Sequence, residues 1–268
     1  MAEKLSEKDI ENINIEGTEE YAVMPLRNTV LFPQQVIPIY IGREKSLKLI
    51  SDIELEKRKY IIVVAQEDGS IEDPSTEDLY SYGTLATVLK VFAMPDNSKS
   101  AIVQGLARVK ILDYLSKEPY FKAAASKVSD DPISDSIELD DIVDNLRTSF
   151  SDLIKVAPNL TEEHTGMLSN IKKPNRLVDR AVSLMTLPNQ EKQEILEEVN
   201  IKSRIDKAIS IINREIQRIK LGEEIQTEVH DEIAKTQREY YLREQMKAIQ
   251  KELGEDEGTV ELKELEER

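Results

Sequence analysis

The chain has 268 residues, of which 40% are apolar, 33% are charged and only 5% are aromatic. Its formal net charge of −16 argues against nucleic acid or an anionic membrane as the main partner, because phosphate groups are bound by basic surfaces. The lack of cysteine excludes disulfides, thiolate catalysis and cysteine-ligated zinc, and it fits a reducing cytoplasm.

Residues 1–20 are polar and acidic and predict a disordered leader. They have neither the basic nor the apolar region of a signal peptide. No stretch of the sequence approaches the roughly 18 apolar residues of a membrane-spanning helix. We therefore expect a soluble, cytoplasmic protein that does not contact a membrane.

Residues 21–128 are predicted to form a β-rich domain that contains one helix. The runs 36–41 and 60–65 have the length of strands, and the second is apolar throughout, as in a strand buried on both faces. Pro38 in the first run indicates an edge strand or a bulge, because proline cannot donate to a ladder. Apolar residues at helical spacing predict a helix over residues 43–57.

The second half of this domain reads as further strands. Turn-forming residues at 94–98 predict a hairpin between strands at 83–93 and 100–104, and Gly105 marks a bulge or bend before two more extended stretches, 106–115 and 120–128. Six or seven short strands with one helix indicate a small twisted sheet or pseudo-barrel.

From residue 129 onward the pattern is helical. Residues 129–200 are predicted to form a helical bundle whose segments are separated at Pro158, Pro174 and Pro188. The predicted fold class is therefore α+β, with an N-terminal twisted β-sheet or pseudo-barrel and its helix, followed by an all-α bundle that ends in a long projecting helix.

That long helix is expected over residues 201–253, followed by an acidic linker at 254–268. Apolar residues at heptad spacing predict a seam formed by Ile205, Ile209, Ile212, Ile216, Ile219, Leu242, Met246, Ile249 and Leu253. Gly222 lies where the spacing shifts and could bend the helix. A helix of roughly 75 Å exceeds the diameter of either domain, so we expect it to project from them. Its apolar seam then needs a partner, either a second copy of the chain or a domain outside this sequence. The alternative is that the first half of the helix packs on its own domain.

The sequence carries no recognisable catalytic, cofactor-binding or metal-ligating constellation. None of its nine glycines is followed by lysine, so a phosphate-binding loop of the Walker type is absent. His164 and His230 lie in different predicted helices and are interpreted as surface residues. Capping explains the carboxylate pairs Asp130-Asp131 and Asp140-Asp141 better than acid/base chemistry does.

One short run of basic residues stands out in this acidic chain. Lys172 and Lys173 are followed by Arg176 and Arg180, and a solvated helix end is favoured over a binding patch. We therefore expect no specific nucleic-acid site.

Two segments resemble the Lon protease family. The first, residues 21–114, includes Met24-Pro25-Leu26-Arg27-Asn28, Leu31-Phe32-Pro33 and Val103-Gln104-Gly105-Leu106-Ala107-Arg108-Val109, and it looks like the family's N-terminal β-domain. The second, residues 237–254, resembles the segment that precedes the ATPase module in bacterial members. The resemblance implies that ATP, Mg and the Ser/Lys protease dyad belong to modules absent from this sequence, so this chain is not expected to be an enzyme itself.

The same resemblance implies a function. In the family this region recognises unfolded or degron-tagged protein substrates and helps to organise a hexamer, so we expect both kinds of partner. The turn-forming segment after the first strand supplies a candidate apolar contact patch for such substrates, made of Pro25, Leu26, Phe32 and Pro33. Two alternatives stay open: a purely structural spacer and oligomerisation module, and a free-standing enzyme, which no constellation of residues supports.

Overall fold

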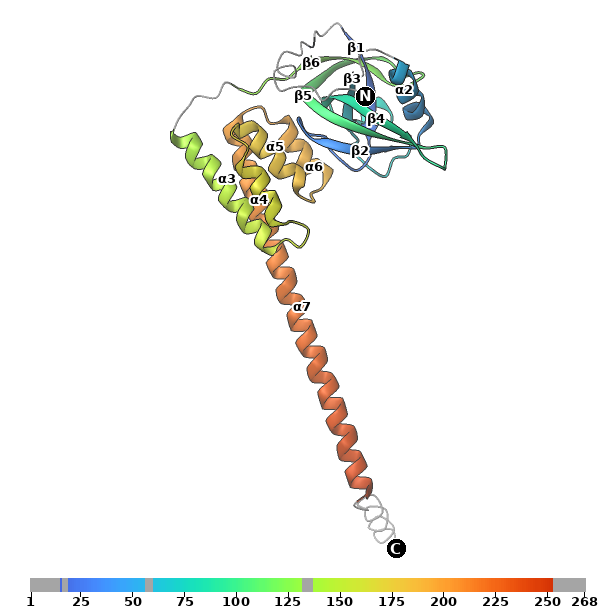
Figure 1. Ribbon diagram of the computed structural model, residues 1–268. Coiled ribbons are helices and arrows are strands. Elements are labelled where there is room, and N and C mark those ends of the chain that lie inside the picture. The colour runs from blue at the N-terminus through green and yellow to red at the C-terminus, as the bar shows by residue number, and fades with distance from the viewer. Residues whose placement is uncertain (1–14, 16–18, 56–59, 132–136, 253–268) are drawn as a thin grey trace. The chain divides into compact units, whose positions relative to one another are not determined.

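The computed structural model describes residues 15, 19–55, 60–131 and 137–252 (Figure 1). The chain divides into two compact units, Met1–Asn213 and Arg214–Arg268. The predicted linker at 254–268 lies outside the described residues, and so does the predicted leader apart from Ile15, Glu19 and Glu20. The apolar side chain of Ile15 is buried in a core that also contains Tyr21 and Val23, and the disordered leader stays a prediction.

The described strands belong to one sheet with the order β2-β5-β4-β3-β1-β6. Their bounds are β1 (Glu20–Leu26), β2 (Val36–Ile41), β3 (Tyr60–Ala65), β4 (Tyr82–Ala93), β5 (Lys99–Ser116) and β6 (Lys122–Lys127). β1 and β3 are parallel, and the other pairs are antiparallel.

The long strand β5 closes this sheet into a barrel. Its first half pairs with β2, from Lys99 to Gln104, and its second half pairs with β6, from Val109 to Ser116. Because β6 also pairs with β1, the strands β5, β4, β3, β1 and β6 form a ring, with β2 attached outside it as an edge strand. The pseudo-barrel and the edge position of Pro38 are therefore confirmed.

The continuous apolar run of β3 is explained by burial on both faces. Ile61 and Val63 pack into one core together with the helix α2, while Ile62 and Val64 pack into a second core inside the barrel. Adjacent side chains of a strand point to opposite faces, so a strand between two cores needs apolar residues at every position.

The helix α2 (Glu44–Leu55) covers one face of the sheet, as Figure 1 shows. Its residues Leu49, Ile50 and Ile53 are buried in the first core, which confirms the helical spacing read from the sequence. A short 3₁₀ turn, η1 (Thr76–Asp78), is capped by Ser75 before β4 begins.

The two strands predicted at 100–104 and 106–115 are parts of one strand. β5 runs from Lys99 to Ser116 without interruption, and Gly105 pairs with Ala86 beside a register shift, since the next β4 partner, Leu85, pairs with Ala107. Gly105 thus marks a bulge, as expected, but the ladder continues past it because β4 supplies hydrogen-bonding partners on both sides of the bulge.

The rest of the first unit is helical. Its helices are α3 (Ile137–Val156), α4 (Glu162–Ser169), α5 (Pro174–Leu184), α6 (Asn189–Glu197) and the beginning of α7 (Ile201–Glu252). Leu146 and Phe150 of α3 and Leu177 of α5 are almost completely buried. The predicted α+β fold class is confirmed. The strands and the bundle share one compact unit, so the predicted domain boundary at residue 129 stays a prediction.

The helix α7 is uninterrupted from Ile201 to Glu252, including Gly222. Among its first seam residues Ile205 and Ile212 are buried, and Ile209, Ile216 and Ile219 are half-buried. Leu242, Met246 and Ile249 are 53%, 62% and 55% exposed, and Leu253 lies outside the described residues. The alternative that the first half packs on its own domain therefore holds for Ile205 and Ile212.

Candidate functional site

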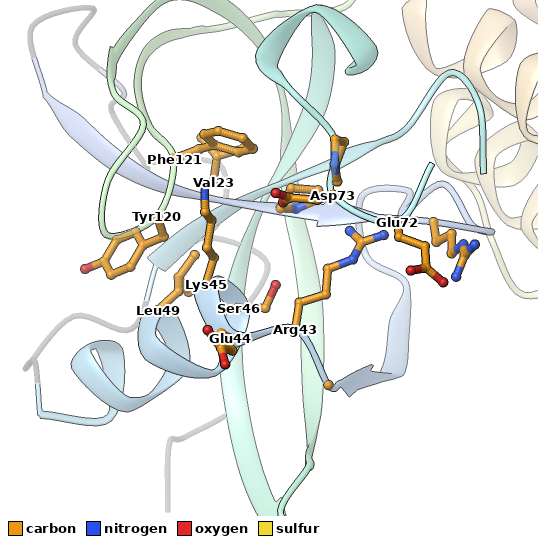
Figure 2. Close-up of a pocket in the computed structure, with 14 residues that line it drawn as sticks. Val23, Arg43, Glu44, Lys45, Ser46, Leu49, Glu72, Asp73, Tyr120 and Phe121 are labelled. Atoms are coloured by element: carbon orange, nitrogen blue, oxygen red, sulfur yellow. The ribbon is translucent and has the colours of Figure 1, made fainter. Parts of the chain in front are cut away.

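A cavity of about 490 Å³ opens between the first turn of α2 and the C-terminal part of β1 (Figure 2). We call it the α2 cavity. It is lined by Val23, Pro25, Arg27, Gly42, Arg43, Glu44, Lys45, Ser46, Leu49, Glu72, Asp73, Pro74, Tyr120 and Phe121. These residues come from β1, the start of α2, the loop before η1 and the segment before β6. The cavity therefore combines an apolar lining with several charged groups.

β1 presents an open edge at this cavity. Its pairing with β6 covers Glu20 to Ala22, and the N–H of Val23 donates to the Phe121 carbonyl at 2.8 Å. Backbone groups two residues apart in a strand point to the same side, so the Pro25 carbonyl also faces away from β3. Among the described residues no hydrogen bond to this carbonyl is found. Since proline has no N–H, Pro25 offers an acceptor and no donor on this side of β1.

Two arginines lie next to each other at one side of the cavity. Arg27 donates to the carbonyls of Gly69 and Ser70, the latter at 3.1 Å. Arg43 donates to Gln66 Oε1 at 2.8 Å. Burial lowers the pKa of Arg43, and the adjacent positive charge of Arg27 lowers it further. Both guanidinium groups are thus held by neutral oxygens.

The opposite side of the cavity is apolar, with one lysine above it. The buried rings of Tyr120 and Phe121 form the wall, and Lys45 Nζ lies 5.6 Å from the centre of the Phe121 ring. Lys45 also pairs with Glu118 at 2.9 Å, and this hydrogen bond raises the pKa of the lysine. The ammonium group therefore has a close ion-pair partner, whereas the carboxylates of Asp73 and Glu72 act on Arg43 only from a distance.

The residues that form this site lie in the part of the chain that matches a known protein family. The family described as "ATP-dependent protease La (LON) substrate-binding domain" matches residues 20–214 of the chain. The chain belongs to this family.

Curated Lon proteases are similar to the chain over most of its length. It is 39% identical to the Lon protease of Dictyoglomus thermophilum over 248 residues, which cover 92% of this chain and 31% of that protein. With the Lon protease of Koribacter versatilis it shares 41% identity, covering 92% of this chain and 30% of the relative. The chain therefore spans about a third of the length of the Lon proteases it matches, and it corresponds to their N-terminal region.

Solved structures share the fold. The N-terminal domain of Mycobacterium avium complex Lon protease aligns with a TM-score of 0.59 at 18% identity, covering 73% of this chain and 98% of that one. The Lon N-terminal domain protein from Xanthomonas campestris aligns with a TM-score of 0.51 at 14% identity, covering 72% and 98%. At such identities the likeness concerns the fold alone.

The predicted contact patch of this Lon domain is only partly exposed. Leu26 and Phe32 are 5% and 1% exposed, so the expectation of an apolar patch at these two positions is wrong. Pro25 and Pro33 are half-buried. Pro25 lines the α2 cavity, whereas Pro33 lines a second cavity of about 660 Å³ together with Arg176 and Arg180. The four residues therefore do not form one surface.

Phe32 is buried because its loop is fastened to β5. The N–H of Gln34 donates to the Gly105 carbonyl at 3.0 Å, and the N–H of Gly105 donates to the Gln35 carbonyl at 2.9 Å. A Cβ atom at Gly105 would lie 2.3 Å from the Phe32 carbonyl oxygen. The sequence predicts a bulge or bend at Gly105, but it does not predict which loop packs against this glycine.

A buried ionic cluster was missed altogether. Arg108 on β5 and Arg204 on α7 both contact Asp130 and Asp179. Asp130 is therefore not the helix-capping residue that was expected, because it accepts from Arg204 and from Asn175. The available signal was the placement of Arg108 and Asp179 within otherwise apolar stretches, since buried charges in proteins are normally paired.

The two histidines lie in separate helices, α4 and α7. His164 takes part in the cap of α4, where its Nδ1 lies 3.0 Å from the Thr161 nitrogen, and His230 is exposed on α7. In the ranges that the structure describes, no group of three or more His, Asp or Glu side chains could hold a metal ion. None of the helices found there is both long and apolar enough to cross a membrane.

Proposed function

We propose that this chain recruits unfolded or degron-tagged protein segments to an ATP-dependent Lon protease, and that the α2 cavity receives one of their apolar side chains. The observation that supports this most directly is the cavity itself, which is open and lined by Tyr120, Phe121 and Pro25 beside an unpaired edge of β1. Natively folded proteins keep large apolar side chains inside, so such a pocket favours unfolded chains.

The edge of β1 gives a reason for binding extended backbone. A substrate strand that donates one N–H to the Pro25 carbonyl would send its adjacent side chain toward the cavity, because side chains alternate along a strand. Because Pro25 offers only its carbonyl, the main-chain contact made there is short, and a hydrogen bond to backbone does not depend on the substrate's side chains. Recognition of many different unfolded segments needs that property.

The remaining activities are proposed for the complete protease. We infer that ATP and Mg bind to an ATPase module outside these residues, that a Ser/Lys dyad cleaves the recruited segments, and that the protein acts in the cytoplasm. The family and the lack of cysteine support these inferences.

A binding titration tests recruitment. The chain is titrated into a fluorescently labelled, permanently unfolded protein such as casein, without nucleotide, and anisotropy is recorded. Saturable binding that unlabelled casein competes away, and that a stably folded protein of similar size does not, is the expected result. Absence of binding at any accessible concentration would contradict recruitment by this region.

The exposed apolar residues of α7 favour a second role, in assembly. Large apolar side chains on this helix are between 50% and 68% exposed: Leu221, Ile225, Val229, Ile233, Tyr240, Tyr241, Leu242, Met246 and Ile249. An isolated amphipathic helix rarely leaves so many apolar residues in water unless a partner covers them. We propose that α7 supports self-association, in the hexamer of the full-length protease.

One set of variants separates the two roles. The triple substitution Leu242→Glu, Met246→Glu and Ile249→Glu places charges on α7 far along the sequence from the α2 cavity, and Gln245→Glu on the same helix is its control. Loss of self-association in sedimentation velocity together with retained casein binding would support divided labour. If casein binding were lost as well, α7 rather than the cavity would carry recruitment, and if the chain never self-associates, the assembly role is wrong.

A further inference from the structure

Ser46 is a largely buried residue whose hydroxyl group opens into the α2 cavity and has no hydrogen-bond partner among the described residues. Ser46 is 8% exposed, and its side chain makes no hydrogen bond with any described residue. Figure 2 shows its oxygen directed into the space between Lys45, Arg43 and Asp73. Buried hydroxyl groups in native proteins are normally hydrogen-bonded, because leaving one unpaired is unfavourable. An unpaired hydroxyl that faces a cavity is therefore available to a ligand that enters it.

The serine belongs to the first turn of α2, where backbone donors are also unpaired. The first turn of any helix has N–H groups without an intrahelical acceptor, and here they belong to Glu44, Lys45 and Ser46, which all line the cavity. The first intrahelical bond is donated by Leu47 to the Arg43 carbonyl at 2.9 Å. Such a helix end carries a partial positive charge and attracts anions.

The two arginines add full charges to these donors. Arg27 and Arg43 donate to carbonyl and amide oxygens, and among the described residues neither forms an ion pair with a carboxylate. Two adjacent guanidinium groups repel each other, and the nearby carboxylates of Asp73 and Glu72 offset this only in part, so an anion placed between the arginines and the helix end would relieve the repulsion further. Arginine is well suited to a carboxylate, which it can hold with two parallel hydrogen bonds.

We propose that the first turn of α2, with Ser46 and Arg43, is a carboxylate-binding subsite, which anchors a carboxylate of the recruited peptide next to the apolar side chain held by Tyr120 and Phe121. This inference rests on the proposed recruitment and specifies its substrate class. The carboxylate comes either from the α-carboxylate at the end of a chain or from an acidic side chain beside an apolar residue. Both sources present the same oxygen pair to the same donors.

Three acidic residues also line the cavity and oppose such a ligand. Glu44, Glu72 and Asp73 are exposed, which places them at the solvent side of the cavity (Figure 2). Their charges weaken the attraction for an anion without occupying the donors, since Ser46 stays unpaired. The proposal therefore predicts that neutralising Asp73 strengthens carboxylate binding.

Three peptides of one length test the subsite by fluorescence anisotropy. The first ends in Leu-Phe with a free α-carboxylate, the second is its C-terminal amide, and the third is an amide with Asp placed before the final Phe. Tighter binding of the first peptide than of the amide, by about tenfold, is the result expected for a hydrogen-bonded carboxylate. The third peptide decides between the sources: it matches the first if side-chain carboxylates are accepted and the amide if they are not.

Variants of the whole chain show whether α2 is responsible. Ser46→Ala should lower affinity for the free-acid peptide by about tenfold and leave the amide unaffected, because only the carboxylate uses the hydroxyl. It should not lower the thermal midpoint, since no native hydrogen bond is removed. Asp73→Asn should tighten binding of the acid but not of the amide. Arg238→Gln on α7 is the control for Arg43→Gln, which should weaken binding of the acid.

Each outcome decides the proposal. A free-acid preference that Ser46→Ala abolishes supports it. Equal affinity of acid and amide, with casein still bound, overturns the carboxylate subsite and leaves recruitment intact. A preference for a peptide amide with Lys before the final Phe overturns it as well, because the acidic residues would then dominate. If neither the peptides nor casein bind, recruitment itself has failed.

Discussion

The guanidinium of Arg108 on β5 donates to the carboxylate of Asp179 on α5, 71 residues further along the chain, and both side chains are 5% exposed. Arg108 also donates to the Leu196 carbonyl at 2.9 Å, at the end of α6. One side chain of the barrel thereby binds two helices of the bundle. The strands and the bundle are therefore held together by charges that water does not screen.

Removing one member of this cluster should be costly. Asp179→Ala leaves Arg108 and Arg204 with one carboxylate between them, and loss of a partner from a buried ion pair typically costs about 3–5 kcal/mol. We expect a decrease of that order in the free energy of unfolding, measured by urea denaturation. Asp152→Ala breaks the exposed pair with Lys155 and should cost no more than about 1 kcal/mol. Similar losses in the two variants would contradict a structural role for the cluster.

The same cluster makes stability depend on acid. Burial alone would raise the pKa of Asp130, but the charges of Arg108 and Arg204 and the hydrogen bonds to Asp130 outweigh burial and lower it below its ordinary value of 3.8. A lowered folded-state pKa stabilises the fold above the ordinary value, and this contribution is lost as the pH falls through the lowered one.

Asp130→Asn tests that dependence. The variant should be less stable than the wild type at neutral pH, and its urea midpoint should fall less steeply on acidification below about pH 4. Parallel curves for the two proteins over this range would show that Asp130 does not contribute to the acid dependence.

Two glycines should respond in opposite directions to the same substitution. Gly105→Ala forces its Cβ against the Phe32 carbonyl oxygen, a backbone atom, and should destabilise the first unit by about 1–3 kcal/mol or more. Gly222→Ala on α7 meets nothing within 4 Å and should increase helix stability by about 1 kcal/mol. Circular dichroism during thermal and urea unfolding measures both. Destabilisation by Gly222→Ala would indicate that this glycine has a conformation other than an ordinary helix.

Phe32 should behave as a core residue and not as a contact residue. Phe32→Ala removes a side chain that is 1% exposed and should cost about 3–5 kcal/mol of unfolding free energy. Pro33→Ala next to it, half-buried in the loop, should cost much less. If Phe32→Ala were stable and yet lost casein binding, the original expectation of a contact at this position would be restored.

Much of the fold could be predicted from local features of the sequence. The apolar run of β3, the helical spacing of α2 and the proline in β2 each constrain their own surroundings, because periodicity and the missing N–H of proline act within a few residues. Contacts between distant segments were not accessible in this way. Arg108 and Asp179 meet only because β5 and α5 pack together, and Phe32 is buried only because its loop reaches Gly105.

The candidate site was likewise predictable only where it depends on local sequence. Pro25 was predicted from the sequence to contact substrates; it lines the α2 cavity, and the contact itself stays a prediction. Ser46 and Arg43 belong to a helix start that was predicted, but their relation to Tyr120 and Phe121 depends on how α2 packs against the end of β1. No local pattern marks a serine that lacks a hydrogen-bond partner.

The central claim is that unfolded segments bind at the α2 cavity, and chemical-shift mapping tests it most directly. Amide spectra of the isotope-labelled chain are recorded with and without an unfolded peptide that ends in Leu-Phe, in the absence of nucleotide. We predict that the largest perturbations occur at Lys45, Ser46, Tyr120 and Phe121. Perturbations confined to residues of α7, or spectra that do not change at saturating peptide, would contradict the account.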